Sequence, residues 1–154
     1  CIVPERREEL TTEGGLDAVG KLAELAPWVK RLSDVGVQVA LFLDPEQRQL
    51  EAARDIGAHV VELHTGEYCN ATGDNQAEEL ARLVRAAALV VELGMECHAG
   101  HGLTLKNVGP EAQIPEVVEL NIGHAIIAEA VFDGLEAANR AMREAMDQDR
   151  MSVA

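Results

Sequence analysis

The sequence predicts an α/β fold built on a parallel sheet, and two observations carry that prediction. Short apolar runs alternate with segments of helical spacing, in the order β–loop–α–β–α–β–α–β–(α)–β–α. Glycine follows three of the helical segments, at Gly36, Gly57 and Gly94, where it is the preferred residue for ending a helix. Alternation of this kind implies parallel strands joined by right-handed crossovers. No internal repeat or linker interrupts it, so we expect a single domain over residues 1–154.

The elements are placed by their spacing and by the residues at their boundaries. Apolar runs predict strands at residues 1–3, 37–43, 60–63, 95–99 and 117–122. Helical spacing predicts helices at residues 16–32, 45–56, 74–94, 125–132 and 135–146. We expect Asp44 to cap the second helix with Pro45 at its first position, and Pro27 to kink the first helix or divide it. The stretch that contains Pro110 and Pro115 has room for one short helix at most.

Composition and charge limit the classes of partner. Hydrophobic residues make up 47% of the 154 residues, which suffices for a buried core, and aromatic residues only 3%. With 13 basic and 27 acidic residues the formal charge is −14, which argues against nucleic acid and anionic membrane surfaces. No apolar run approaches the roughly 18 residues of a membrane span. The three cysteines lack metal-binding spacing, so we expect no metal site and reduced thiols in the cytoplasm.

Two turns that follow predicted strands carry glycine beside histidine. The first is His98-Ala-Gly-His-Gly-Leu-Thr104, and Glu119-Leu-Asn-Ile-Gly-His-Ala125 repeats its plan. Glycine there can take a positive φ or let a ligand come close to the backbone. Two such turns at strand ends indicate a phosphate site with an acid–base group beside it. The alternative is a pair of ordinary βα turns with histidines that face solvent.

Glu62 and the polar loop of residues 4–15 are further candidates for function. Glu62 interrupts an otherwise apolar strand, and a carboxylate in that position is costly unless it faces a polar cavity or a partner. It is therefore either a cavity residue or a salt-bridged strand residue. Long ordered loops are more often functional than idle, although a solvated connector remains the alternative for residues 4–15.

Several segments resemble the pyridoxine 5′-phosphate synthase family of the deoxyxylulose-dependent route to vitamin B6. They are Val3-Pro-Glu5 with Thr11-Thr-Glu-Gly-Gly-Leu-Asp17, Glu62-Leu-His-Thr-Gly66, Ala99-Gly-His-Gly-Leu-Thr104 and Glu119-Leu-Asn-Ile-Gly-His-Ala-Ile-Ile127. They occur in the family's order and near its spacing, over essentially the whole chain. The resemblance implies a (β/α)8 TIM barrel in the parent protein. This chain is then a partial barrel of about five parallel strands with alternating helices, expected to begin partway through a larger protein and to lack the first three βα units.

The resemblance also implies a transferase reaction and the residues that take part in it. In that family 1-deoxy-D-xylulose 5-phosphate condenses with 3-amino-2-oxopropyl phosphate to give pyridoxine 5′-phosphate, phosphate and water, with no cofactor and no metal. His101 corresponds to the catalytic proton donor. Substrate-binding roles are implied for Thr11, Gly102, Gly123, His124 and Glu62. The family tends to assemble, so a homo-oligomer is implied as well.

Two other functions stay open at the level of the sequence. One is another phosphate-handling TIM-barrel isomerase or aldolase. An aldolase with a Schiff-base lysine would need that lysine at a strand end, but Lys21, Lys30 and Lys106 all lie in predicted helices or loops. The other is a non-catalytic phosphate-binding fragment, because the family's amino-terminal bases fall outside this sequence. Open sheet edges and an uncovered apolar wall further predict that the chain associates.

Overall fold

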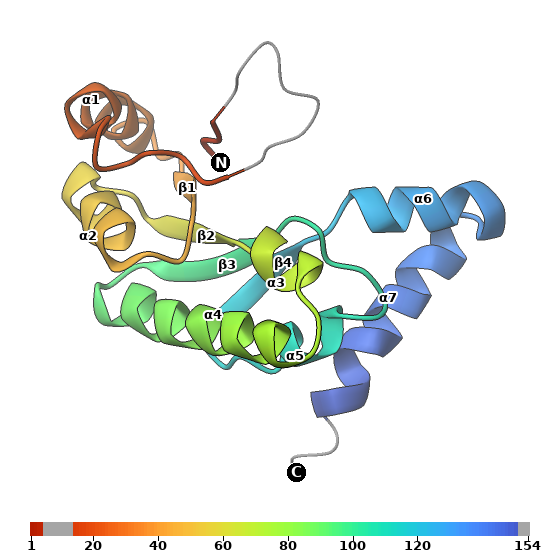
Figure 1. Ribbon diagram of the computed structural model, residues 1–154. Coiled ribbons are helices and arrows are strands. Elements are labelled where there is room, and N and C mark those ends of the chain that lie inside the picture. The colour runs from red at the N-terminus through yellow and green to blue at the C-terminus, as the bar shows by residue number, and fades with distance from the viewer. Residues whose placement is uncertain (5–13, 151–154) are drawn as a thin grey trace.

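The computed structural model describes the backbone of residues 1–4 and 14–150 and the side chains of residues 1–4 and 14–147 (Figure 1). Its strands are β1 (Ala40–Leu43), β2 (Val60–His64), β3 (Glu96–Gly100) and β4 (Val117–Asn121). Its helices are α1 (Leu22–Ser33), α2 (Gln47–Ile56), α3 (Gly66–Asn70), α4 (Asp74–Glu92), α5 (Val108–Ala112), α6 (His124–Asp133) and α7 (Leu135–Arg150). The strands form one parallel sheet in the order β1-β2-β3-β4. The predicted α/β fold with alternating helices is therefore confirmed.

The first predicted strand is reduced to a single parallel bridge. Ile2 pairs with Leu41, donating its N–H to the carbonyl of Ala40 at 2.8 Å and accepting the N–H of Phe42 at 3.0 Å. Pro4 follows and has no N–H with which to continue the ladder. Within the described residues the sheet therefore has four strands and one bridge, where the sequence predicts about five strands.

One face of the sheet is apolar and carries the packed core. Residues that alternate along β1, β2 and β3 point to this face and are buried: Leu41, Leu43, Val61, Leu63, Cys97 and Ala99. The helices α2 and α4 cover it, and α1 packs beside α2 (Figure 1). Burial of each Leu or Val contributes about 1.5–3 kcal/mol to folding. Burial of this face under the helices therefore stabilises the fold and holds the strands in place, with their carboxyl ends at one edge of the sheet.

The opposite face of the sheet is largely polar. The register places Phe42, Glu62, His98 and Glu119 in one row across all four strands. The imidazole of His98 lies 2.7 Å from Glu96 and 3.4 Å from Glu119. The expectation of an uncovered apolar wall is therefore wrong for this face, because its strand residues carry carboxylates and an imidazole instead.

The starts of α1 and α2 differ from those predicted, and α1 begins at Leu22 instead of residue 16. The helix α2 begins at Gln47 after Glu46, so Asp44 is not its cap and Pro45 is not its first residue. Asp44 instead accepts the N–H of Gly15 at 2.9 Å and pairs with His64. Pro27 lies inside α1 and does not divide it. The stretch expected to be a turn after β2 contains the short helix α3.

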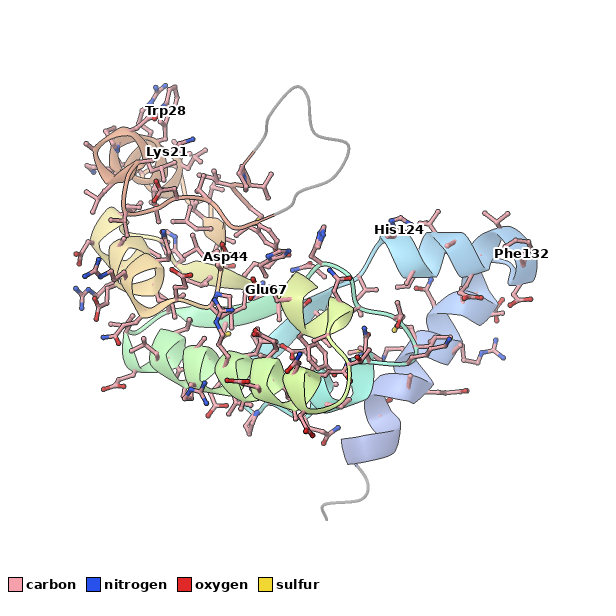
Figure 2. The ribbon with its side chains drawn as sticks, viewed as in Figure 1. Lys21, Trp28, Asp44, Glu67, His124 and Phe132 are labelled. Atoms are coloured by element: carbon pink, nitrogen blue, oxygen red, sulfur yellow. The ribbon has the colours of Figure 1, made fainter. Side chains whose placement is uncertain are left out.

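The last two helices form an arm beside the sheet. In Figure 1, α6 runs away from the sheet and α7 returns to pack on α5. No residue of α6 is buried, and Phe132 is 86% exposed. Figure 2 shows His124 at the end of α6 nearest the sheet and Phe132 at its far end. Among the described helices, none has the length and apolar character needed to cross a membrane.

Candidate active site

The carboxyl ends of the strands surround a cavity of about 680 Å³. Its walls come from β1, β2 and β4, from the turns after β3 and β4, and from the start of α6. Five of the residues singled out in the sequence line it: Glu62, His101, Gly102, Gly123 and His124. The sixth, Thr11, lies outside the described residues. The two glycine–histidine turns thus open onto one space, as expected for neighbouring parallel strands.

The backbone at His101 is held in a strained conformation. His101 has φ 82°, the one positive φ at a non-glycine residue in the described part of the chain, and Gly102 follows with φ 83°. Such a conformation costs about 1–3 kcal/mol and persists when neighbours enforce it. The fully buried hydroxyl of Thr65 lies 2.6 Å from the His101 carbonyl and 2.8 Å from that of Gly100. The Thr65 side chain therefore fixes the turn that presents His101.

The imidazole of His101 lies among other rings at the edge of the cavity. Its centroid is 4.9 Å from that of His64 and 6.2 Å from that of Phe42. Desolvation lowers the pKa of His101 from its usual 6.5, and the neighbouring His64 and His124 lower the pKa further. These effects favour the neutral imidazole, whereas an anion in the cavity would favour its protonation.

The second turn places the amino terminus of a helix against the cavity. Gly123 is the N-cap of α6 and His124 its first residue. The first N–H groups of a helix have no carbonyl partner within it, and its dipole favours an anion at this end. A Cβ built on Gly123 would meet nothing within 4 Å. Packing thus does not require glycine at this position, but a ligand that approaches the backbone would.

Glu62 projects from β2 into the same cavity. Burial raises the pKa of its carboxyl, and Glu119 raises it further, while His98 lowers it. A Cβ on Gly100 would lie 2.7 Å from the Glu62 carboxylate, so glycine at position 100 leaves room for this side chain. Among the described residues Glu62 forms no ion pair within salt-bridge distance. This arrangement favours the cavity interpretation of Glu62 over the salt-bridge interpretation.

Sequence reasoning missed two residues beside the cavity, Asp44 and His64. Their Oδ1 and Nδ1 atoms lie 3.0 Å apart. The sequence predicts a helix cap at Asp44 and assigns no role to His64. Their position in the sequence could have indicated them, because both lie at the carboxyl ends of adjacent parallel strands, where functional side chains collect. In the described part of the chain no cluster of three or more His, Cys, Asp or Glu residues is arranged to hold a metal ion.

Comparison with known proteins gives one consistent result. The family described as "Pyridoxal phosphate biosynthesis protein PdxJ" matches residues 1–148. Three curated relatives carry the name pyridoxine 5′-phosphate synthase. The one from Rhodospirillum rubrum is 55% identical over 148 residues, and those from Jannaschia sp. and Zymomonas mobilis are 56% identical over 154 residues and 51% over 150.

These matches cover 96–97% of this chain and 59–62% of the relatives. The chain thus spans about three-fifths of the length of the curated relatives it matches. Four parallel strands with alternating helices fit part of a TIM barrel. The family match over residues 1–148 identifies the chain as a member of the PdxJ family of pyridoxal phosphate biosynthesis proteins.

Proposed function

We propose that the protein carrying this chain is a pyridoxine 5′-phosphate synthase. It condenses 1-deoxy-D-xylulose 5-phosphate with 3-amino-2-oxopropyl phosphate and releases pyridoxine 5′-phosphate, phosphate and water. The observation that carries the proposal is the single cavity shared by His101, Glu62 and the amino terminus of α6. The names of relatives more than 50% identical to this chain support the same reaction.

The phosphate of a substrate binds between the two glycine–histidine turns. The amides at Gly123 and His124 and the positive end of the α6 dipole attract a dianion. Gly102, with its positive φ, brings a further stretch of backbone to the cavity without a side chain. The imidazole of His124 supplies another donor when it is protonated.

His101 acts as the proton donor once the phosphate is bound. Imine formation, dehydration and ring closure each require proton transfers, and imidazole gives and takes protons near pH 7. The pKa of His101 is lowered in the free protein, chiefly by desolvation. A phosphate dianion beside it favours the imidazolium, so the donor acquires its proton when substrate arrives. The reaction as proposed requires no metal or redox cofactor.

Glu62 and Thr11 complete the proposed substrate contacts. The raised pKa of Glu62 lets its carboxyl hold a proton nearer to neutral pH than an exposed glutamate does. Thr11 is assigned through the resemblance of its segment to the family's loop over the site. The three cysteines are unpaired, which agrees with a cytoplasmic enzyme, and we expect it to be a homo-oligomer.

The test is turnover by the protein expressed from its whole coding sequence. With both substrates present we expect pyridoxine 5′-phosphate to form. The variant His59→Gln, which replaces an exposed histidine outside the cavity, is the matched control. Binding of pyridoxine 5′-phosphate without turnover would favour a non-catalytic phosphate-binding protein instead. Conversion of either substrate in the absence of the other would favour an isomerase or aldolase. The same assay on residues 1–154 measures how much of the activity this chain carries.

A further inference from the structure

A second histidine is buried directly behind His101. The His64 side chain, at the end of β2, is 8% exposed, and the ring of Phe42 packs against it at 5.1 Å. A Cβ on Gly66 would lie 2.6 Å from Nε2 of His64 and 3.5 Å from Cδ2 of His101. Glycine at position 66 therefore lets the two imidazoles approach with no side chain between them.

Asp44 fixes the orientation of the His64 ring. One carboxylate oxygen of Asp44 faces Nδ1 of His64 at 3.0 Å and also accepts the N–H of Gly15 at 2.9 Å. The pKa of Asp44 is lowered, chiefly by its hydrogen bond with His64. An ionised carboxylate requires the proton on Nδ1, so Nε2 is the nitrogen left to gain or lose a proton. That atom is buried and has no hydrogen-bond partner among the described residues.

The titratable and charged groups around His101 come from four elements. Asp44 follows β1, Glu62 and His64 belong to β2, Cys69 to α3, and His124 and Glu129 to α6. His64 is distinct among them because its ring packs on the His101 ring, at 4.9 Å between centroids. Two imidazolium ions at that separation repel each other, so the protonation of one ring opposes that of the other.

We propose that His64, oriented by Asp44, is a positioning residue that controls when His101 carries a proton. His64 does not line the cavity, so it acts through His101 and not on the substrate. A proton on His64 disfavours one on His101 until a bound phosphate ester adds negative charge on the cavity side. No covalent bond changes in this step. The inference rests on the proposed role of His101, but its first test does not require turnover.

That test is a histidine titration by NMR of the whole protein with ¹³C-labelled imidazoles. In the wild type we expect the resonances of both His64 and His101 to follow two coupled steps. In His64→Gln we expect a single step for His101, with a midpoint about 0.5–1 pH unit higher because a neighbouring cation is lost. His59→Gln, which removes an exposed imidazole outside the cavity, is the control and should leave the His101 curve unchanged.

Independent single-step curves in the wild type would overturn the proposal, whether or not the variant folds. A His101 curve in folded His64→Gln that coincides with the wild-type curve would do so as well. If turnover is found, the pH profile of kcat in His64→Gln should move with the NMR midpoint. A lower kcat with an unmoved profile would mean that His64 has only a structural role. Absence of turnover together with coupled titration would refute the proposed function and leave the His64–His101 coupling standing.

Discussion

At the scale of single residues, His101 carries the chemistry that we propose. Replacing it with alanine removes the proton donor and leaves the Thr65 bond to the backbone carbonyl of residue 101 in place. We expect kcat to fall by roughly 10²–10⁴, the usual effect of losing a general acid. Steady-state kinetics on the full-length protein, with circular dichroism to establish folding, measures this. A folded His101→Ala variant with near-normal kcat would remove His101 from the mechanism.

The cavity glycines provide a matched pair of substitutions. Gly102 has φ 83° and a Cβ there would lie 3.0 Å from Cβ of Cys69, so Gly102→Ala should destabilise the fold by about 1–2 kcal/mol. Gly123→Ala meets no protein atom within 4 Å and should change stability by less than about 0.5 kcal/mol. Its methyl group would obstruct a phosphate, and we expect about tenfold weaker binding of pyridoxine 5′-phosphate. Denaturant unfolding and calorimetric titration separate the two effects, and unchanged affinity in Gly123→Ala would place the phosphate elsewhere.

The site residues that could be predicted have a local signal in the sequence, whereas those that were missed depend on a long-range contact. Glycine beside histidine after an apolar run is a local signal, and Gly102, Gly123 and their histidines could be read from it. Asp44 gave an ambiguous signal, because an aspartate before proline is equally a helix cap and a strand-end carboxylate. Only the pairing of β1 with β2 brings Asp44 to His64, and that long-range contact has no trace in the local sequence.

At the scale of elements, α5 contains a buried carboxyl group that the proposed mechanism does not use. Glu111 is fully buried, and neither of its carboxylate oxygens has a hydrogen-bond partner among the described residues. Desolvation raises its pKa from 4.5 to about 7. The folded state therefore holds this proton more tightly than the unfolded state. The cost of Glu111 to stability is absent below pH 4.5, grows as the pH rises, and is complete above pH 7.

We expect Glu111→Gln to remove this pH-dependent cost. The variant should match the wild type near pH 4.5 and exceed it in free energy of unfolding at pH 8 by up to about 3 kcal/mol. Urea unfolding of both proteins at several pH values measures the difference. A difference that stays constant across this range would show that the pKa of Glu111 is the same in the folded and the unfolded protein, and would contradict the prediction.

Element boundaries could be predicted where one residue decides them. Gly57 ends α2 with φ 90°, as its place in the sequence indicates. Pro4 likewise limits the strand at residues 1–3, because it has no N–H with which to continue the ladder beyond the Ile2–Leu41 bridge. The helix α3 was missed because five residues give too little periodicity to distinguish a helix from a turn.

At the scale of the whole molecule, the exposed arm predicts that residues 1–154 associate in solution. Phe132 is 86% and Val131 76% exposed on α6, and within the described residues β4 pairs with β3 alone. We expect a mass above that of a monomer by light scattering, and a shift toward the monomer in Phe132→Glu. The exposed Glu136→Ala on α7 is the control. A monomeric wild type with a sharp thermal transition would contradict the prediction.

The alternation of strands and helices was sufficient to predict the parallel sheet. It was not sufficient to predict the polar row of Glu62, His98 and Glu119, because the register shift between Cys97 and His98 decides which β4 residue joins that row. A bulge of this kind depends on the packing of two strands.

The central claim is that one cavity joins the two glycine–histidine turns into a phosphate site with an imidazole beside it. Titration of the ¹⁵N-labelled full-length protein with pyridoxine 5′-phosphate tests it most directly. The largest chemical-shift changes should fall on the amides of Gly102, Gly123 and His124 and on the His101 ring, whose titration midpoint should rise by about 1 pH unit. Changes confined to residues outside the cavity, with an unmoved His101 midpoint, would contradict the claim.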